Sequence, residues 1–273
     1  MARQHLGQHF LGDPAWREQI ARAIRVSRHS LAPVSTKAGG KDRCWIEIGA
    51  GHGEMTAHLA ATGAPVYAIE LDAVLARKLK DLAKQFPNLT VVSGDVLKTD
   101  IAKLADGRRA HIYGNLPYYI TSPILQHVFA NSGLIDEMHM VIQTEVAERL
   151  TAEPNSKDYG YLTVLTRVHS RPEFVFRIPR GAFLPPPDVS SALVTLRFPG
   201  ENVDVAPDEQ EQFLEFVKAC FSQKRKTLVN SLKSAMPRES LRDAMTALKL
   251  RPDARAEQLS VADFAGLWRR TRG

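Results

Sequence analysis

Short apolar runs alternate with segments of helical spacing along the first two-thirds of the chain. Each run has the length and composition of a buried strand. The five runs are Cys44–Ile48, Val66–Glu70, Leu89–Val92, Ala110–Tyr113 and Met138–Ile142. The helical segments are one that opens at Asp13-Pro14, then Thr56–Ala61, Ala73–Gln85 and Ile124–Phe129. Strands that alternate with helices in this way predict an α/β fold, with a parallel sheet and helices on both faces.

The pattern changes in the last third of the chain. Two strand-like runs, Glu173–Ile178 and Ser191–Phe198, follow each other without a long helix and predict an antiparallel edge to the sheet. Beyond a polar stretch that starts at Pro199, apolar residues fall at helical spacing. The first such stripe contains Phe213, Phe216, Val217, Cys220 and Phe221. We therefore expect an α/β domain over residues 1–199 and a small all-helical domain over residues 200–273.

Composition narrows the class of protein without identifying it. Hydrophobic residues make up 44% of the 273 residues and charged residues 24%, ordinary globular values that exclude extensive disorder. No apolar run approaches the roughly 20 residues of a membrane helix, and residues 1–8 contain no apolar signal core. The two cysteines, Cys44 and Cys220, fit buried thiols in a reducing compartment. We expect a cytoplasmic protein without membrane attachment.

Positive charge is concentrated near the end of the chain. Residues 1–217 contain 23 basic and 25 acidic residues, whereas residues 218–273 contain 13 basic and 5 acidic ones. This asymmetry favours a catalytic body followed by a basic domain, for which phosphate is the commonest polyanionic partner. On charge alone, a solvated cationic helix surface explains the excess equally well.

The ends of the predicted strands carry the candidate chemistry, because open α/β sheets bind ligands beyond the carboxyl ends of their strands. The first strand ends in a glycine-rich turn, Glu47-Ile48-Gly49-Ala50-Gly51-His52-Gly53-Glu54. Glycines there let the backbone approach a ligand closely, although a purely structural turn is the alternative. Glu54 replaces the last glycine of the dinucleotide pattern G-x-G-x-x-G, which disfavours NAD.

Acidic residues follow the second and third strands. Glu70 lies 21 residues after Gly49, where an acid accepts hydrogen bonds from ribose hydroxyls. Asp95 can accept a hydrogen bond from an adenine amino group, and turn formation with Gly94 is the simpler explanation for it. Together with the glycine turn, these acids predict an adenosine-bearing cofactor across three adjacent strand ends.

The segment after the fourth strand adds the sequence Asn115-Leu116-Pro117-Tyr118. With this motif the chain resembles the ribosomal RNA adenine dimethyltransferases, a family of class I, S-adenosylmethionine-dependent methyltransferases, and within it the bacterial small-subunit enzymes. The resemblance covers nearly the whole chain. The other matching segments are Leu6–Leu11, Glu47–Gly51, Glu70–Asp72, Gly94–Asp95, Pro154–Gly160, Phe183–Ala192 and Cys220–Leu228. His9 and Tyr119 stand where asparagine is common in the family.

The resemblance implies a Rossmann-like methyltransferase sheet, S-adenosylmethionine as cofactor and small-subunit (16S) rRNA as partner. The implied reaction dimethylates two adjacent adenosines of the 3′-terminal hairpin, with a role in subunit biogenesis. The residues it implies for cofactor binding are His9, Leu11, Glu47, Gly49, Gly51, Glu70, Asp95, Val96 and Asn115. We expect a monomer, and no metal, because the nine histidines form no metal-binding spacing with the two cysteines.

The Asn115 motif is expected to orient the target amine. The side-chain oxygen of Asn115 and the carbonyl of Leu116 can accept its hydrogens and favour the charge that develops on nitrogen. Pro117 stiffens the loop. Tyr118 and Phe183 are expected to stack on the two faces of the adenine, the alternative being that both are ordinary core aromatics.

Three basic residues, Lys224, Arg225 and Lys226, are expected to contact RNA phosphates, unless they only form a solvated helix start. Other functions remain open. One is a large-subunit rRNA adenine methyltransferase of the antibiotic-resistance type, which the Asn115 motif and the basic tail disfavour. A second is a non-catalytic ribosome assembly factor, and a third is an NAD-dependent oxidoreductase. The intact Asn115 motif argues against both.

Overall fold

The structure is a computed structural model that describes residues 9–26, 42–201, 203–223, 226–233 and 236–272. The described residues form two compact units. The first unit is drawn from the ranges Met1–Ala147 and Glu173–Pro199, and the second from Glu148–Pro172 and Gly200–Gly273. No helix in the described parts of the chain combines the length and hydrophobicity that a bilayer-spanning segment requires.

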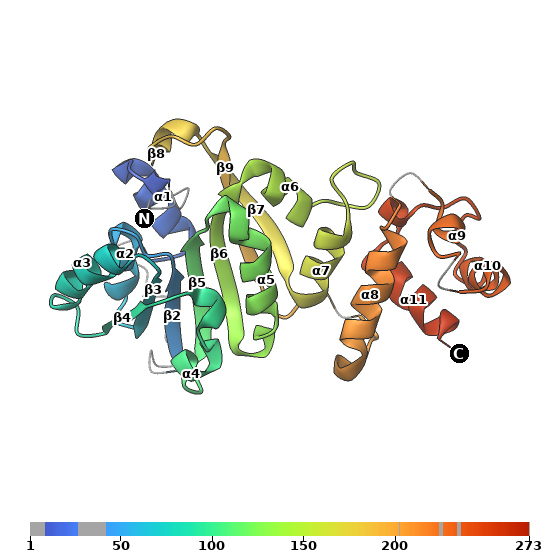
Figure 1. Ribbon diagram of the computed structural model, residues 1–273, viewed down its shortest axis with the longest axis horizontal. Helices are drawn as coiled ribbons and strands as arrows, with labels where there is room; N and C mark the ends of the chain where they lie inside the picture. The colour runs from blue at the N-terminus through green and yellow to red at the C-terminus, as the bar shows by residue number, and fades with distance from the viewer. Residues whose placement is uncertain (1–8, 27–41, 202, 224–225, 234–235, 273) are drawn as a thin grey trace, which may run out of the picture. The chain divides into compact units, whose positions relative to one another are not determined.

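The first unit is built on a seven-stranded sheet of order β4-β3-β2-β5-β6-β9-β7 (Figure 1). The strands are β2 (Arg43–Ile48), β3 (Val66–Glu70), β4 (Leu89–Ser93), β5 (Arg109–Asn115), β6 (Ile135–Gln143), β7 (Arg171–Ile178) and β9 (Ser191–Arg197). Strands β2 to β6 pair in parallel, and β9 is antiparallel to β6. The predicted parallel sheet with an antiparallel edge is confirmed. A separate antiparallel pair joins β1 (Phe10–Leu11) to β8 (Phe183–Leu184).

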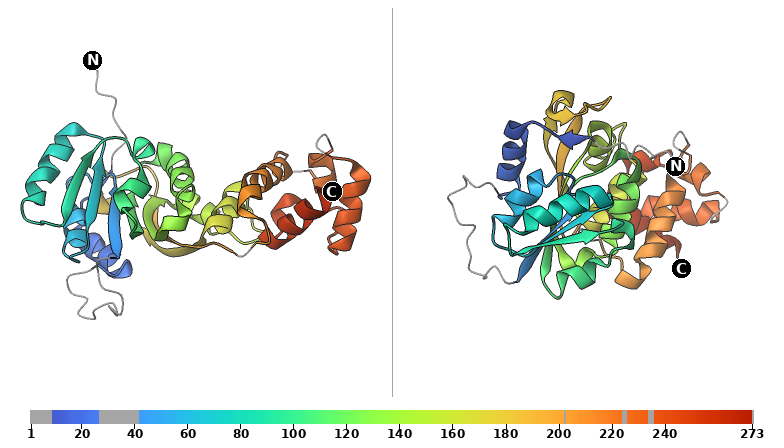
Figure 2. Two further views of the ribbon diagram at one scale, coloured as in Figure 1. Left: turned by 90° about the horizontal axis from the view of Figure 1, so that it is seen from below. Right: turned by 60° about the vertical axis from the view of Figure 1, so that its left-hand side comes forward.

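Helices lie on both sides of this sheet (Figure 2). They are α1 (Pro14–Ala23), α2 (Glu54–Ala60), α3 (Ala73–Ala83), α4 (Ile101–Ala105), α5 (Thr121–Phe129) and the start of α6 (Thr144–Leu150). Helix α1 begins as the sequence predicts: Pro14 is its first residue, and the Asp13 carboxylate accepts a hydrogen bond from the Ala15 amide at 2.8 Å. Buried residues of α1 and α2, such as Ile20 and Leu59, pack in one core with sheet residues such as Val66. This packing fixes the strand ends that carry the candidate site.

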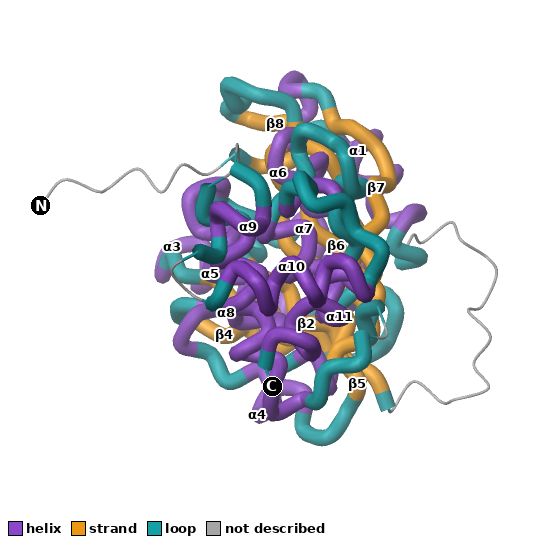
Figure 3. Tube along the Cα trace, turned by 90° about the vertical axis from the view of Figure 1, so that its right-hand side faces the viewer, coloured by secondary structure: helices purple, strands orange, loops and turns teal. Residues whose placement is uncertain are grey.

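The second unit is helical (Figure 3). Its helices are α7 (Tyr161–His169), α8 (Gln210–Cys220), α9 (Leu228–Ser231), α10 (Arg238–Ala247) and α11 (Val261–Thr271). Phe213, Val217 and Cys220 of α8 are buried in its core, so the predicted apolar stripe and the predicted burial of the Cys220 thiol are confirmed.

The division into units differs from the predicted one between residues 148 and 172. The sequence assigns this segment to the α/β domain, but Val164 and Val168 of α7 lie in the core of the second unit. Threonine and valine make up four of the nine residues of α7, and such β-branched residues give a weak helix signal. Thr163 secures the helix, because its hydroxyl donates to the Arg149 carbonyl at 2.6 Å and accepts from the Gly160 amide at 3.1 Å.

Candidate active site

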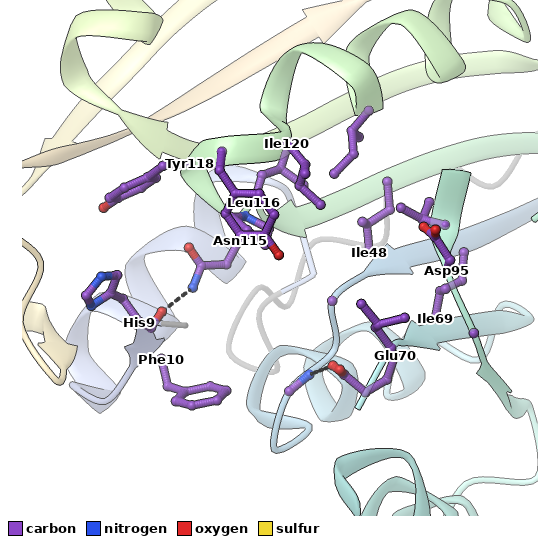
Figure 4. Close-up of a pocket in the computed structure, with 18 residues that line it drawn as sticks. His9, Phe10, Ile48, Ile69, Glu70, Asp95, Asn115, Leu116, Tyr118 and Ile120 are labelled. Carbon is purple, nitrogen blue, oxygen red and sulfur yellow. Dashed lines mark hydrogen bonds between the residues drawn. The ribbon is translucent and has the colours of Figure 1, made fainter. Parts of the chain in front are cut away.

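An open pocket lies at the carboxyl ends of β2, β3, β4 and β5. Figure 4 shows Asn115, His9 and Tyr118 on one side of it, and Glu70 and Asp95 on the other. The predicted residues that line it are His9, Gly49, Gly51, Glu70, Asp95, Val96, Asn115, Leu116, Pro117 and Tyr118. A smaller pocket shares Gly49, Gly51 and Asn115 with it and adds Leu11 and Glu47. Four separate strand ends therefore bring most of the predicted site together.

The glycine turn after β2 needs its glycines for two reasons. Gly49, Gly51 and Gly53 have φ angles of 70°, 59° and 89°, a region that side chains rarely adopt. A Cβ atom on Gly53 would also lie 2.9 Å from the terminal carbons of Leu79 and Leu82 in α3. The third glycine therefore allows close helix packing, which in turn fixes the loop beside the pocket.

Glu70 connects the ends of two strands. Its Oε2 accepts a hydrogen bond from the Gly51 amide and its Oε1 accepts one from the Asp72 amide, both at 2.8 Å. The side chain is buried, yet it lines the pocket. Each carboxylate oxygen keeps a further lone pair, so Glu70 can still accept hydrogen bonds from a ligand.

Asp95 serves the turn after β4 and also lines the pocket. Its Oδ1 accepts a hydrogen bond from the Leu97 amide at 2.9 Å and caps the short helix Val96–Lys98. Asp95 therefore does form the turn, as the simpler explanation requires. This hydrogen bond uses only Oδ1, so Oδ2 remains as a second acceptor and Asp95 can still bind a ligand.

Glu47 is a buried acid in the wall of the smaller pocket. Burial raises its pKa to about 8, with the nearby carboxylates of Glu54 and Glu70 acting in the same direction. The hydroxyl of Thr56 donates to its Oε2 at 2.5 Å and opposes this shift. The protonated form of Glu47, which can donate a hydrogen bond, is therefore much more favourable here than for a glutamate in water.

Asn115 is held in one orientation at the end of β5. Its Nδ2 donates a hydrogen bond to the His9 carbonyl at 2.8 Å (Figure 4). The amide oxygen Oδ1 therefore remains as an acceptor beside the pocket. The following residues are anchored too, because the Leu116 amide donates to the Val141 carbonyl of β6 at 3.0 Å. The motif presents acceptors on a fixed backbone.

The ring of Tyr118 lies beside the same segment. Its hydroxyl is 3.0 Å from the Ser191 hydroxyl, and its ring stacks on His9 with 5.9 Å between centroids and 26° between planes. His9 is fixed in turn by a 2.9 Å hydrogen bond between Nδ1 and the Pro185 carbonyl. Burial raises the pKa of Tyr118, so its hydroxyl stays protonated.

The family model for ribosomal RNA adenine dimethylases matches residues 1–271. The chain belongs to this family.

Curated relatives and solved structures agree with this assignment. "Ribosomal RNA small subunit methyltransferase A" of Xanthomonas campestris is 38% identical over 268 residues, which cover 97% of this chain and 95% of the relative. A dimethyladenosine transferase from Plasmodium falciparum has a TM-score of 0.73 at 25% identity, covering 95% of this chain and 96% of that one. The 23S rRNA methyltransferase ErmE has a TM-score of 0.71 at 27% identity, covering 97% and 100%. The fold is that of a class I methyltransferase, and the chain is an rRNA adenine dimethyltransferase. The oxidoreductase and the non-catalytic factor are thereby excluded.

Within this rRNA adenine dimethylase, Phe183 does not lie where the sequence places it. Its side chain is 4% exposed, packs in the core of the first unit and lines neither pocket. In the β1–β8 pair Phe183 lies opposite Leu11, and the next residue, Leu184, is 71% exposed. Neighbouring strand residues point to opposite sides, so an inward Phe183 requires an outward Leu184. In the structure Phe183 thus faces the core rather than the pocket, and its stacking on adenine stays a prediction.

Six apolar residues that line the pocket are not among the predicted site residues. They are Phe10, Ile48, Ile69, Leu71, Ile120 and Ile124. Leu71 is 53% exposed directly after Glu70, and an exposed leucine next to a buried acid is a signal that only the structure reveals.

The structure describes one of the three residues that are predicted to contact RNA. Lys224 and Arg225 lie outside the described residues, and Lys226 is exposed.

Proposed function

We propose that this chain transfers methyl groups from S-adenosylmethionine to the N6 amine of adenosine in small-subunit rRNA, and that it dimethylates two adjacent adenosines of the 3′-terminal hairpin. The observation that carries the proposal is the Asn115 amide, whose Nδ2 is bound by the His9 carbonyl so that Oδ1 is left for an amine donor. Relatives at 37–38% identity have small-subunit names, which supports this choice of subunit.

The residues around the two pockets fit an adenosine-bearing cofactor. S-adenosylmethionine, when bound, supplies an activated methyl group on sulfur. Glu70 has lone pairs left for the ribose hydroxyls, and Oδ2 of Asp95 can accept from the adenine amino group. We assign the surrounding contacts to His9, Leu11, Glu47, Gly49, Gly51 and Val96.

The target amine is a weak nucleophile, so its orientation matters more than a base. Asn115 Oδ1 and the Leu116 carbonyl accept its hydrogens, direct its lone pair at the methyl group and favour the positive charge that develops. Pro117 limits the freedom of the loop. Tyr118 offers a ring for the adenine, an interaction that contributes about 1–3 kcal/mol per stacked base. The adenine must first leave its helix to reach this ring.

The basic second unit is the proposed RNA-binding part. Exposed Lys226, together with Lys224 and Arg225, gives the positive charge that binds phosphate. We further propose a cytoplasmic monomer that acts during small-subunit biogenesis.

One alternative is favoured by a specific observation. The likeness to ErmE extends over the whole of that chain, so a large-subunit rRNA substrate is the second candidate.

Transfer of labelled methyl from S-adenosylmethionine to unmethylated small and large subunits, with nucleoside mass spectrometry, separates the two candidates. We expect dimethyladenosine in small-subunit RNA only, at two adjacent positions. Product in large-subunit RNA would favour the alternative, and product in neither would contradict the proposed function.

A further inference from the structure

A second group of polar side chains lies at the opposite end of the same strands. His111 follows the start of β5, while Glu137 and His139 lie on β6, and one ligand atom from each falls within 4.8 Å of the others. His111 precedes Asn115 by four residues, which separates the two positions by about 13 Å along an extended strand. The active site does not use this group.

Strand register builds the group. His111 pairs directly with Glu137, and His139 lies two residues further along β6, so all three side chains point to the same face of the sheet. Both imidazoles approach one carboxylate oxygen. Glu137 Oε2 is 3.3 Å from Nε2 of His139 and 3.8 Å from Nδ1 of His111.

The other nitrogen of each imidazole faces a partner of its own. Nδ1 of His139 is 2.9 Å from the Thr195 hydroxyl, and Nε2 of His111 is 3.7 Å from Oδ2 of Asp136. A metal-binding histidine usually has such an outer partner, which holds the proton on one nitrogen and leaves the lone pair of the other for the ion.

The surroundings of His139 Nε2 are the strongest indication of a ligand. The side chain is 3% exposed, and this buried atom lies 3.3 Å from Glu137 Oε2 as an ion-pair neighbour, without the alignment of a hydrogen bond. A buried polar atom without a hydrogen bond is costly.

We propose that His111, Glu137 and His139 bind a divalent transition-metal ion of the zinc type, in a site separate from the methyl-transfer site. Bond lengths of about 2.0–2.2 Å in tetrahedral geometry place ligand atoms about 3.3–3.6 Å apart, close to the two distances to Glu137 Oε2. Arg197 contacts the other oxygen, Oε1, at 3.5 Å and leaves Oε2 for the ion. The sequence analysis predicts no metal because the histidines form no metal-binding spacing with the cysteines. That criterion does not detect this group, because no cysteine takes part in it.

Zinc alone is the probe. The full chain, stripped with a chelator, is titrated with zinc against a chromophoric competitor, and its thermal midpoint is measured with and without the ion. We expect one zinc per chain and a raised midpoint, because the ion binds the folded state. His111→Gln and Glu137→Gln should each weaken binding by more than about tenfold. His169→Gln removes a histidine of the second unit and should bind as the wild type does.

The variants are compared with wild type by circular dichroism and melting without metal. If Glu137→Gln, which also loses the contact with Arg197, does not fold, His111→Gln decides, because its side chain is partly exposed. Absence of zinc binding in the wild type, or unchanged binding in folded His111→Gln, would overturn the proposal and leave a cross-strand ion pair. Methyl transfer is not the readout, so the outcome is independent of the proposed function.

Discussion

Strand β5 ends at Asn115 and has His111 near its start, and the two ends of the sheet are organised differently. At the carboxyl end, polar side chains are held by hydrogen bonds to backbone groups: Glu70 to the Gly51 amide and Asn115 to the His9 carbonyl. At the amino end, side chains such as Glu137 interact mainly with other side chains across strands.

This difference separates two ways of building a site. Backbone hydrogen bonds fix one orientation and leave a defined acceptor toward the pocket, as methyl transfer to a weak nucleophile requires. Side chains that converge on one carboxylate keep unused lone pairs, which suits an ion. The predictions below test this contrast, beginning with the largest expected effect.

Replacing the residue at the carboxyl end of β5 should abolish most activity. Asn115→Ala removes the acceptor Oδ1, and we expect the single-turnover rate of methyl transfer to fall by about 10²–10³-fold. RNA binding should change little. The matched control is His111→Gln at the amino end of the same strand, which should keep the wild-type rate. Equal losses in the two variants would mean that the ends are not functionally distinct.

The buried acid at the carboxyl end should make stability depend on pH. The Glu47 pKa is about 8 when folded and near 4.5 when unfolded, so the folded state holds the extra proton between these values. Its contribution is complete below pH 4.5 and falls as pH rises through 8, by about 2 kcal/mol between pH 6 and pH 8. Urea unfolding at both pH values should show this fall in wild type and a smaller one in Glu47→Gln. Equal falls in the free energy of unfolding in the two proteins would show that Glu47 is ionised in the folded state at both pH values.

The glycine turn can be compared with a turn that precedes the amino end of β3. Gly53 and Gly63 both have positive φ, 89° and 81°, but a Cβ on Gly63 would meet no atom within 4 Å. Gly53→Ala should therefore cost about 1 kcal/mol more than Gly63→Ala in urea unfolding, because it also contacts Leu79 and Leu82. Similar losses of unfolding free energy in the two variants would mean that α3 shifts to make room for the Cβ atom at no cost.

The smallest effect is expected at Tyr118. Tyr118→Phe keeps the ring but removes the hydrogen bond with Ser191, so stability should fall by about 0.5–1.5 kcal/mol. The methyl-transfer rate should remain close to wild type, because the ring is retained for stacking. A large loss of rate with unchanged stability would assign the hydroxyl a direct part in the reaction.

Local motifs explain why the carboxyl end was predictable. The glycine turn, Glu70 and the Asn115 segment each occupy a few consecutive residues directly after a strand, and the structure brings them to one pocket. The inward direction of Phe183 could not be predicted from the sequence, because the direction of a residue in a two-residue strand depends on its pairing, here with Leu11. The group around His111 has no motif, because strand register alone joins residues that lie 26–28 positions apart.

A crystal structure with S-adenosylhomocysteine bound would test the central claim most directly. We predict that the ribose hydroxyls donate to Glu70, that the adenine amino group reaches Asp95, and that the sulfur lies on the Asn115 side of the pocket. A ligand bound away from these strand ends, or one whose adenosine contacts neither acid, would contradict the account.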